Sequence, residues 1–184
     1  ERKLIEEVMN GADIHQATAD LLGISRKYAK TCNFAILYGS GDAKLAGMLG
    51  ISQGEAKAIK NKYFAKLPGV DNLIWQIQRT SKQRGFIYNW FGRKLHTGGF
   101  QFAYKMPNHL IQGGGADVCK RAMVELGDAP MRLQVHDQLV FEVPIGDYQE
   151  IPKWRKIMED VFPEKNGMRM KVDVEWSDRS FAAK

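Results

Sequence analysis

The spacing of apolar positions predicts that the first half of the chain is helical. Apolar residues recur three and four positions apart, the period of an amphipathic helix, over residues 4–9, 14–22, 25–38, 52–66 and 70–84. Polar residues mark the starts of several of these segments. Asp13, Ser25 and Ser52 are predicted N-caps, and Glu55 completes a capping box with Ser52. We therefore expect consecutive helices up to Gly85.

The pattern changes after Gly85. Residues 86–90 and 93–95 are rich in aromatic and apolar side chains and flank Phe91-Gly92, which predicts a hairpin. A long helix is predicted over residues 102–126. Pro107 must kink this helix or mark its true start, and the three glycines at 113–115 weaken it.

The last third predicts a small sheet with a helix. Two apolar runs, residues 131–135 and 139–143, predict strands joined by a tight turn of His136, Asp137 and Gln138. Residues 152–161 predict an amphipathic helix, and 170–176 a closing strand with alternating apolar positions. A helical part followed by an antiparallel sheet with packed helices is an α+β fold. At 184 residues the chain can bury one core or form two subdomains.

The charge is unevenly distributed, and this changes the functional picture. The formal net charge is +6, and residues 72–116 contain no Asp or Glu. Basic residues alternate there with aromatic ones, an arrangement that suits a sugar-phosphate backbone with bases to stack on. The alternative is a solvated basic surface over an ordinary aromatic core. The residues are Arg79, Lys82, Arg84, Arg93, Lys94 and Lys105 among Trp75, Phe86, Tyr88, Trp90, Phe91, Phe100, Phe102 and Tyr104.

Cysteine content and hydropathy predict a cytoplasmic protein. Cys32 and Cys119 lie in predicted helices without metal-ligand spacing, which is typical of small buried residues in a reducing compartment. No apolar run approaches the ~18 residues of a membrane span, and the N-terminus carries no signal-peptide pattern. We expect no membrane partner. The chain begins at Glu1 without an initiator methionine, which suggests a fragment or a cleavage product.

The first candidate site is Arg26-x3-Lys30-x3-Phe34-x3-Tyr38-Gly39. A side chain at every fourth position of a helix builds one face, here with two cations followed by two aromatic rings over about 18 Å. We call these four side chains the ladder. Its alternative interpretations are an exposed basic helix face for the cations and a buried aromatic stripe for the rings.

The second candidate site is the turn Val135-His136-Asp137-Gln138 between two apolar runs. Strand ends hold a carboxylate stiffly, which suits a metal ligand. A surface aspartate and a packed histidine are the alternatives. Together with the ladder, this turn indicates a site that polymerises nucleotides.

These segments resemble family A, DNA polymerase I-like, DNA polymerases. The ladder is similar to the nucleotide-binding helix of that family, and Gln134-Val-His-Asp-Gln-Leu-Val-Phe-Glu-Val to its second catalytic-carboxylate hairpin. Two further segments match in the same order: Asp13-Ile14-His15-Gln16-Ala17-Thr18-Ala19, and Asn108-x3-Gln112-Gly113 with Ala116-Asp117. Four collinear matches over essentially the whole chain are more specific than any single motif.

The resemblance implies residue roles in phosphoryl transfer from a dNTP to a primer 3′-hydroxyl. Arg26 and Lys30 would grip the triphosphate, and Lys30 would also protonate the leaving pyrophosphate. Phe34 and Tyr38 would pack on the sugar and bases. Asp137 would bind Mg²⁺, in a site that uses two ions. The implied catalytic residues are Asp137, Lys30 and His136.

The resemblance also implies contacts with primer-template DNA. Tyr104, Asn108 and Gln112 repeat at four-residue spacing and would face base edges in the minor groove. Tyr38 would contact the templating base, and Gly39 would be a pivot at which the helix closes on correct pairs. Arg93, Lys105 and His136 complete the predicted DNA-binding set, with a solvated surface as the alternative for Arg93 and Lys105.

The chain departs from the family pattern at two positions and by one absence. Many members carry Arg where Tyr104 stands, so a phosphate contact is lost there. Gln138 replaces the usual Glu, which removes a negative charge beside the metal site. The largest departure is an absence: no segment here matches the Asp-Tyr-Ser-type motif that supplies the first catalytic carboxylate.

We therefore expect residues 1–100 to be fingers and 101–184 the C-terminal part of the palm. An upstream segment or a separate chain would carry the missing carboxylate and the thumb. The chain alone is expected to be inactive. Bacterial, phage and organelle origins are all open. Two other functions are alternatives. A single-subunit RNA polymerase has a related helix and His-Asp turn, but Phe34 and the Asn108-x3-Gln112 pair argue against it. A catalytically inactive DNA-binding relative is the second.

Overall fold

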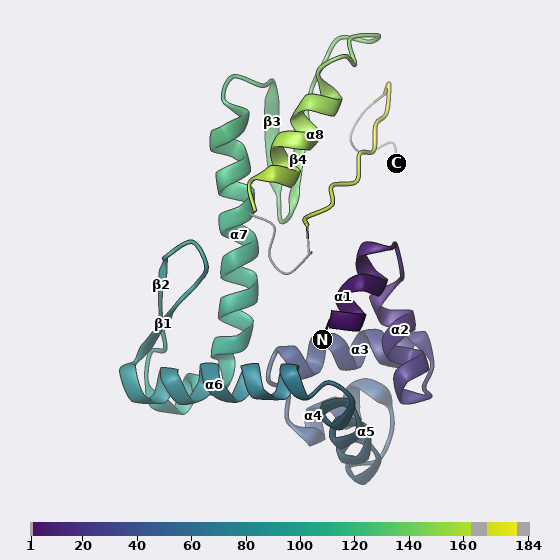
Figure 1. Ribbon diagram of the computed structural model, residues 1–184, viewed down its shortest axis with the longest axis vertical. Helices are drawn as coiled ribbons and strands as arrows, with labels where there is room; N and C mark the ends of the chain where they lie inside the picture. Colours follow the sequence, from purple (N-terminus) through teal and green to yellow (C-terminus); the bar gives the residue numbers. More distant parts are fainter. Residues whose placement is uncertain (1, 163–168, 180–184) are drawn as a thin grey trace. The chain divides into compact units, whose positions relative to one another are not determined.

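The computed structural model describes residues 2–162 and 169–179 (Figure 1). The chain divides into two compact units, Glu1–Gly114 (unit 1) and Gly115–Lys184 (unit 2), and the division falls inside one long helix. Helices dominate, and the strands form two separate antiparallel pairs, so the predicted α+β class is confirmed. The predicted boundary between fingers and palm at residue 100 is a functional division and stays a prediction.

Unit 1 begins with six helices in succession. The apolar spacing predicts five of them and misses the helix at Asp42–Leu49. The six helices are α1 (Arg2–Met9), α2 (Ile14–Leu22), α3 (Arg26–Leu37), α4 (Asp42–Leu49), α5 (Gln53–Lys66) and α6 (Pro68–Arg84). Pro68 occupies the first turn of α6, where its missing N–H costs no hydrogen bond. Gly85, in the left-handed conformation, ends α6.

The three predicted N-caps are confirmed. Asp13 accepts hydrogen bonds from the backbone N–H groups of His15 and Gln16, and Ser25 accepts one from Tyr28. Ser52 and Glu55 form both hydrogen bonds of a capping box at the start of α5. The local sequence thus determines where α2, α3 and α5 begin.

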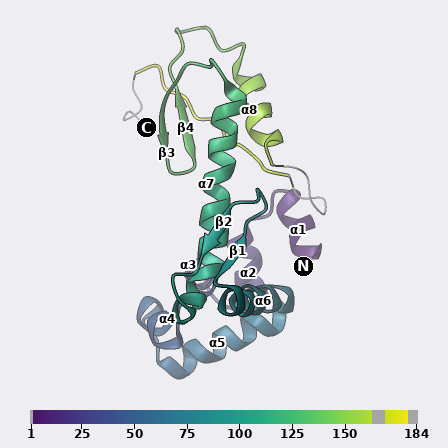
Figure 2. The ribbon, with the colours of Figure 1, turned by 90° about the vertical axis from the view of Figure 1, so that its left-hand side faces the viewer.

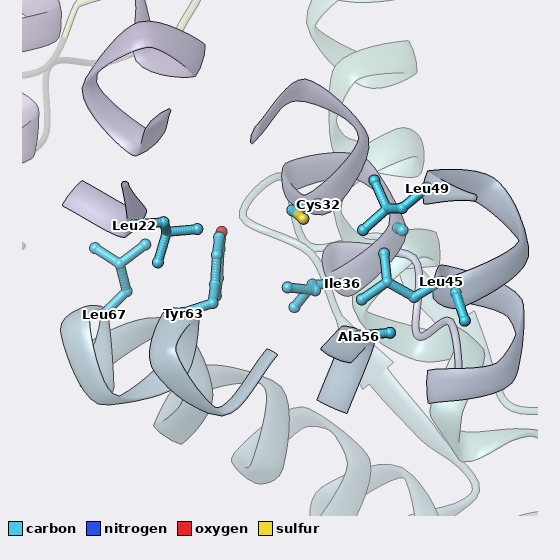
Figure 3. Close-up of a cluster of buried hydrophobic side chains, with 10 residues drawn as sticks. Leu22, Cys32, Ile36, Leu45, Leu49, Ala56, Tyr63 and Leu67 are labelled. Carbon is cyan, nitrogen blue, oxygen red and sulfur yellow. The ribbon is translucent and has the colours of Figure 1, made fainter. Parts of the chain in front are cut away.

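The hydrophobic core of unit 1 lies among α2, α3, α4 and α5 (Figure 3). Cys32, Leu45 and Ala56 are completely buried at its centre, and Tyr63 packs beside Leu22. Cys32 is a free thiol whose pKa is raised by burial, which agrees with the prediction of a small buried residue. Because α3 contributes Cys32, Ala35 and Ile36 to this cluster, its opposite face is left to solvent.

A hairpin and the first part of a long helix complete unit 1 (Figure 2). Strands β1 (Phe86–Tyr88) and β2 (Lys94–His96) pair as predicted, and a 3-10 helix, η1 (Phe100–Lys105), leads into α7 (Met106–Leu126). Pro107 lies in the first turn of α7, so it marks the true helix start instead of a kink.

The glycines of α7 permit a close approach of the hairpin. A Cβ placed on Gly114 would lie 2.0 Å from the Trp90 ring, so no other residue fits there without movement. Arg93 donates a hydrogen bond from Nη2 to the Gly113 carbonyl at 2.7 Å. The glycines at 113 and 114, which lower the helix propensity of α7, are also where the tip of the hairpin packs against this helix.

Unit 2 contains the second hairpin and one further helix. Strands β3 (Met131–Val135) and β4 (Gln138–Phe141) pair in antiparallel register, and helix α8 (Ile151–Asp160) follows them in the chain (Figure 1). Trp154 of α8 stacks on Phe141 of β4 with ring centroids 5.1 Å apart. Because Val135 pairs with Gln138, Gln138 belongs to β4 and the turn is only His136-Asp137. The prediction of a three-residue turn is therefore corrected.

The closing strand predicted over residues 170–176 is wrong. These residues form no strand in the structure. The Val172 N–H donates to the Glu159 carboxylate of α8 at 3.1 Å, and Trp176 contacts Tyr148 with ring centroids 5.3 Å apart. A side-chain acceptor thus takes a backbone donor that a sheet neighbour would otherwise have used.

Candidate nucleotide-binding and catalytic site

The ladder lies on the solvent face of α3, opposite the core. Arg26 and Lys30 are exposed, and the two rings remain accessible, Phe34 at 42% and Tyr38 at 37%. The Phe34 and Tyr38 ring centroids are 5.9 Å apart. The alternative of an aromatic stripe buried in a core is therefore excluded. An exposed row of two cations and two rings offers separate surfaces for an anion and for flat apolar groups.

Arg26 is held by the N-cap of the preceding helix. Its Nε donates to Asp13 Oδ2 at 3.0 Å, and its Nη2 forms a second, short hydrogen bond to the same oxygen. The Arg26 guanidinium, followed by the backbone N–H groups of Gln16 and His15, lowers the pKa of Asp13 to about 2. Asp13 is thus an anion throughout the neutral range.

His15 is a site residue to which the sequence assigned no role. Its ring lies 5.6 Å from the Phe34 ring, and the Asn33 amide donates to His15 Nδ1 at 3.1 Å. Asn33 also donates to Thr18 Oγ1 at 3.0 Å. This buried network fixes the ring beside the ladder and leaves Nε2 to carry the proton of the neutral imidazole. The sequence singles out residues 13–19 as a segment, and that signal could have pointed to His15.

The aromatic end of the ladder meets residues from a distant part of the chain. Gln112 Nε2 donates to the Tyr38 hydroxyl at 2.7 Å. Gly39 has a φ of 73°, and a Cβ added there would lie 2.5 Å from the Tyr104 carbonyl oxygen. Both the backbone conformation and this close approach require glycine. Unit 1 therefore brings together Tyr38, Gly39, Tyr104 and Gln112, all predicted to contact DNA.

The other residues of unit 1 that are predicted to contact DNA differ in the contacts they make within the protein. The Asn108 side-chain oxygen is buried without a hydrogen-bond partner within the described residues, so it is an unsatisfied acceptor. Lys105 lies over the Phe102 ring at 4.9 Å. Arg93 holds the Gly113 carbonyl with one guanidinium nitrogen, which gives it a structural task within unit 1.

In unit 2 the acidic turn has an unusual backbone. His136 has a φ of 54°, the only positive value at a non-glycine residue in the described parts of the chain. Gln134 donates a hydrogen bond to the His136 carbonyl across the turn. Burial and, next, the Asp137 carboxylate raise the pKa of the Cys119 thiol, so Asp137 lies near the second half of α7.

Asp137 is suited to hold a hard cation but does not form a complete site. Its carboxylate is exposed and makes no hydrogen bond or ion pair with any residue that the structure describes. Within residues 2–162 and 169–179, no group of three His, Cys, Asp or Glu side chains comes together. A free carboxylate oxygen suits Mg²⁺, which usually takes one or two protein carboxylates with water and substrate phosphates.

Unit 1 also has an open groove of about 240 Å³ away from the ladder, between α6 and β1. Its lining includes Leu73, Arg84, Tyr88 and Leu110, but none of the predicted site residues.

In the described part of the chain, no helix is both long and apolar enough to cross a bilayer.

Comparison with known proteins identifies the family. The family model of DNA polymerase family A matches residues 1–181. The DNA polymerase of Mycobacterium phage L5 is 36% identical over 151 residues, which is 80% of this chain and 25% of that protein. DNA polymerase I of Geobacillus stearothermophilus is 32% identical over 209 residues, covering 98% of this chain and 24% of that protein. The chain belongs to DNA polymerase family A.

A solved structure supports the same assignment. The polymerase domain of Pol1 from M. smegmatis, in complex with DNA primer-template and dNTP, matches with a TM-score of 0.78 and 27% identity. The match covers 87% of this chain and 33% of that chain. The chain thus spans about a quarter of the two curated relatives and a third of the solved domain.

Proposed function

We propose that this chain is part of a template-directed DNA polymerase and carries its nucleotide-binding helix and one catalytic carboxylate. The observation that carries the proposal is the ladder on the solvent face of α3, whose charges and rings follow the order of a nucleotide's parts. Membership of the chain in DNA polymerase family A, whose relatives named above are DNA polymerases, supports the proposal. The substrates would be a dNTP and a primer-template.

In the proposed reaction the two cations of the ladder act on the triphosphate, and its two rings hold the sugar and the base. The primer 3′-oxygen loses its proton and attacks the α-phosphorus of the dNTP, the bond to the bridging oxygen breaks, and pyrophosphate leaves. Arg26 binds the triphosphate with its planar fork, and Lys30 neutralises charge and donates a proton to the pyrophosphate. Phe34 and Tyr38 hold the sugar and the base by stacking.

Asp137 is the proposed metal ligand. Two Mg²⁺ ions would supply charge stabilisation for the attacking and leaving oxygens. The Asp137 carboxylate forms no hydrogen bond or ion pair within residues 2–162 and 169–179, and His136 lies beside it in the turn. A second carboxylate, as a two-metal mechanism requires, would come from a polypeptide segment other than these 184 residues. The primer-template DNA would be contacted by residues of unit 1, namely Gly39, Tyr104, Lys105, Asn108 and Gln112.

The ladder can be tested by direct binding. We expect Arg26→Ala and Lys30→Ala each to weaken binding of a fluorescent Mg²⁺·dATP analogue by about tenfold or more, because each removes a charge-assisted phosphate contact. Lys27→Ala is the matched control. Lys27 is also an exposed cation on α3 but lies off the ladder. Equal losses in all three variants would reveal general charge attraction and refute the ladder.

The two alternatives have separate tests. A protein that joins these residues to a segment carrying the thumb and the Asp-Tyr-Ser motif should extend a primer with dNTPs much faster than with NTPs. Equal or faster use of NTPs would favour an RNA polymerase. Failure to extend with either substrate, while primer-template is still bound, would favour an inactive DNA-binding relative.

A further inference from the structure

The pairing of Arg26 with Asp13 occurs at an unfavourable place for a cation. Arg26 is the first residue of α3, directly after the cap residue Ser25. A helix N-terminus carries partial positive charge, so a guanidinium there is repelled by the helix and by Lys30 one turn later. Among the described residues, the carboxylate that offsets this charge is Asp13 of the neighbouring helix.

Asp13 is itself fixed at two points. Its Oδ1 accepts hydrogen bonds from the backbone N–H groups of His15 at 2.8 Å and Gln16 at 3.0 Å, while Oδ2 takes both hydrogen bonds from Arg26. Asp13 therefore ties the start of α2 to the start of α3. A carboxylate anchored in this way gives the long Arg26 side chain a defined position before any ligand arrives.

The hydrogen bonds use only one edge of the guanidinium. Asp13 engages Nε and Nη2, and Arg carries five N–H groups in all. The donors on Nη1 and the second donor on Nη2 form no hydrogen bond or ion pair within the part of the chain that the structure describes. They are available to phosphate oxygens.

We propose that Asp13 is a positioning residue of the nucleotide site: it holds the Nε edge of Arg26 so that the Nη1 side is presented to the triphosphate of a dNTP. The proposal rests on the triphosphate-binding role of Arg26 given above. It makes a prediction of definite sign. A carboxylate that only competed with phosphate for Arg26 would weaken nucleotide binding, whereas a positioning carboxylate strengthens it.

The test uses variants that keep the cap of α2. Asp13→Ser retains an N-cap oxygen but is too short to hold Arg26, and Asp13→Asn retains both the cap and a neutral acceptor. We expect Asp13→Ser to weaken binding of Mg²⁺·dATP to the 184-residue chain by about three- to tenfold, the loss for ordering one long side chain on binding. Asp13→Asn should fall between this variant and the wild type.

Two comparisons separate positioning from a structural effect. Ser52→Ala removes the cap of α5, which has no arginine partner in the described structure, and should leave dATP binding unchanged. Binding of deoxyadenosine, which has no phosphate, should be unchanged in Asp13→Ser. In an Arg26→Ala background, Asp13→Ser should have no further effect, because Asp13 acts through Arg26.

Each contrary result has a distinct meaning. Tighter dATP binding by Asp13→Ser would overturn the proposal and make Asp13 a competitor of the substrate. Unchanged dATP binding, or equal weakening of deoxyadenosine, would overturn it in favour of a capping role alone. If Arg26→Ala itself left dATP binding unchanged, the proposed role of the ladder would fail and this inference with it.

Discussion

The two units hold their candidate site residues in different ways. In unit 1 the ladder is backed by a contiguous core in which Cys32, Leu45 and Ala56 have no exposed surface. In unit 2 the buried hydrophobic residues of the described part are only Ala122 and Leu126, and large side chains such as Val124 remain 75% exposed. Unit 1 positions its residues by packing, whereas unit 2 positions Asp137 by the backbone of one turn.

This difference teaches where each site is vulnerable. A ladder on a packed helix tolerates changes on its exposed face, because the buried face carries the stability. A residue in a two-residue turn depends on its neighbours in sequence, here His136 in the left-handed region and Gln134 bonded across the turn.

The largest effect should come from unit 2. In a polymerase that contains these residues with the thumb and the second carboxylate, we expect Asp137→Ala to reduce primer extension by at least about a hundredfold, since a metal ligand contributes several kcal/mol to the transition state. Binding of deoxyadenosine, which has no phosphate to share a metal ion, should stay unchanged in the 184-residue chain. Undiminished extension would remove Asp137 from the mechanism.

The second largest effect should be a difference in how much side-chain truncation lowers the stability of the two units. Leu45→Ala deletes a fully buried side chain of the unit 1 core and should lower the free energy of unfolding by about 2–5 kcal/mol. Leu133→Ala truncates a strand residue that is 50% exposed and should cost under about 1 kcal/mol. Urea unfolding followed by circular dichroism measures both. Similar losses would contradict the contrast in packing between the units.

The contact of the hairpin with α7 should show an intermediate effect. Gly114→Ala places a Cβ where the Trp90 ring lies, so we expect a loss of about 1–3 kcal/mol despite the better helix propensity of alanine. Gly115→Ala, where a Cβ meets no atom within 4 Å, is the matched control and should stabilise or leave stability unchanged. Thermal unfolding of the two variants decides the matter, and equal melting temperatures would disprove the contact.

The smallest effect should be a shift of stability with pH at the start of α3. The pKa of Asp13 is lowered to about 2 from its ordinary value of 3.8, so its contribution to stability is present above pH 3.8 and is lost as the pH falls toward 2. The melting temperature of wild type should therefore fall slightly more than that of Asp13→Asn over this range. A steeper fall in Asp13→Asn would contradict the assignment.

Much of unit 1 could be predicted because its signals are local. Caps, the capping box and the Phe91-Gly92 hairpin each depend on residues within a few positions, and all are confirmed. The four-residue repeat predicted that the ladder shares one helix face, but its exposure required the structure. What required the fold was partnership at long range: His15 beside Phe34, Gln112 on Tyr38, and Arg93 on the Gly113 carbonyl.

Unit 2 shows the opposite limit of sequence reasoning. The alternating residues 170–176 have a strand pattern but form no strand, because a strand also needs a neighbouring edge, and here Glu159 takes the Val172 N–H. Gln138 was assigned to the turn, although its pairing with Val135 places it in β4. Register is a property of two strands and is not encoded in either one alone.

The seam between Gly39 and Tyr104 gives the ladder two unlike ends. At its aromatic end Gly39, directly after α3, packs its backbone against the backbone carbonyl of Tyr104 in η1. At its cationic end the Arg26 side chain is bonded to Asp13, the N-cap of α2. A nucleotide bound along α3 would thus place its base beside a backbone contact and its phosphates beside a side-chain ion pair.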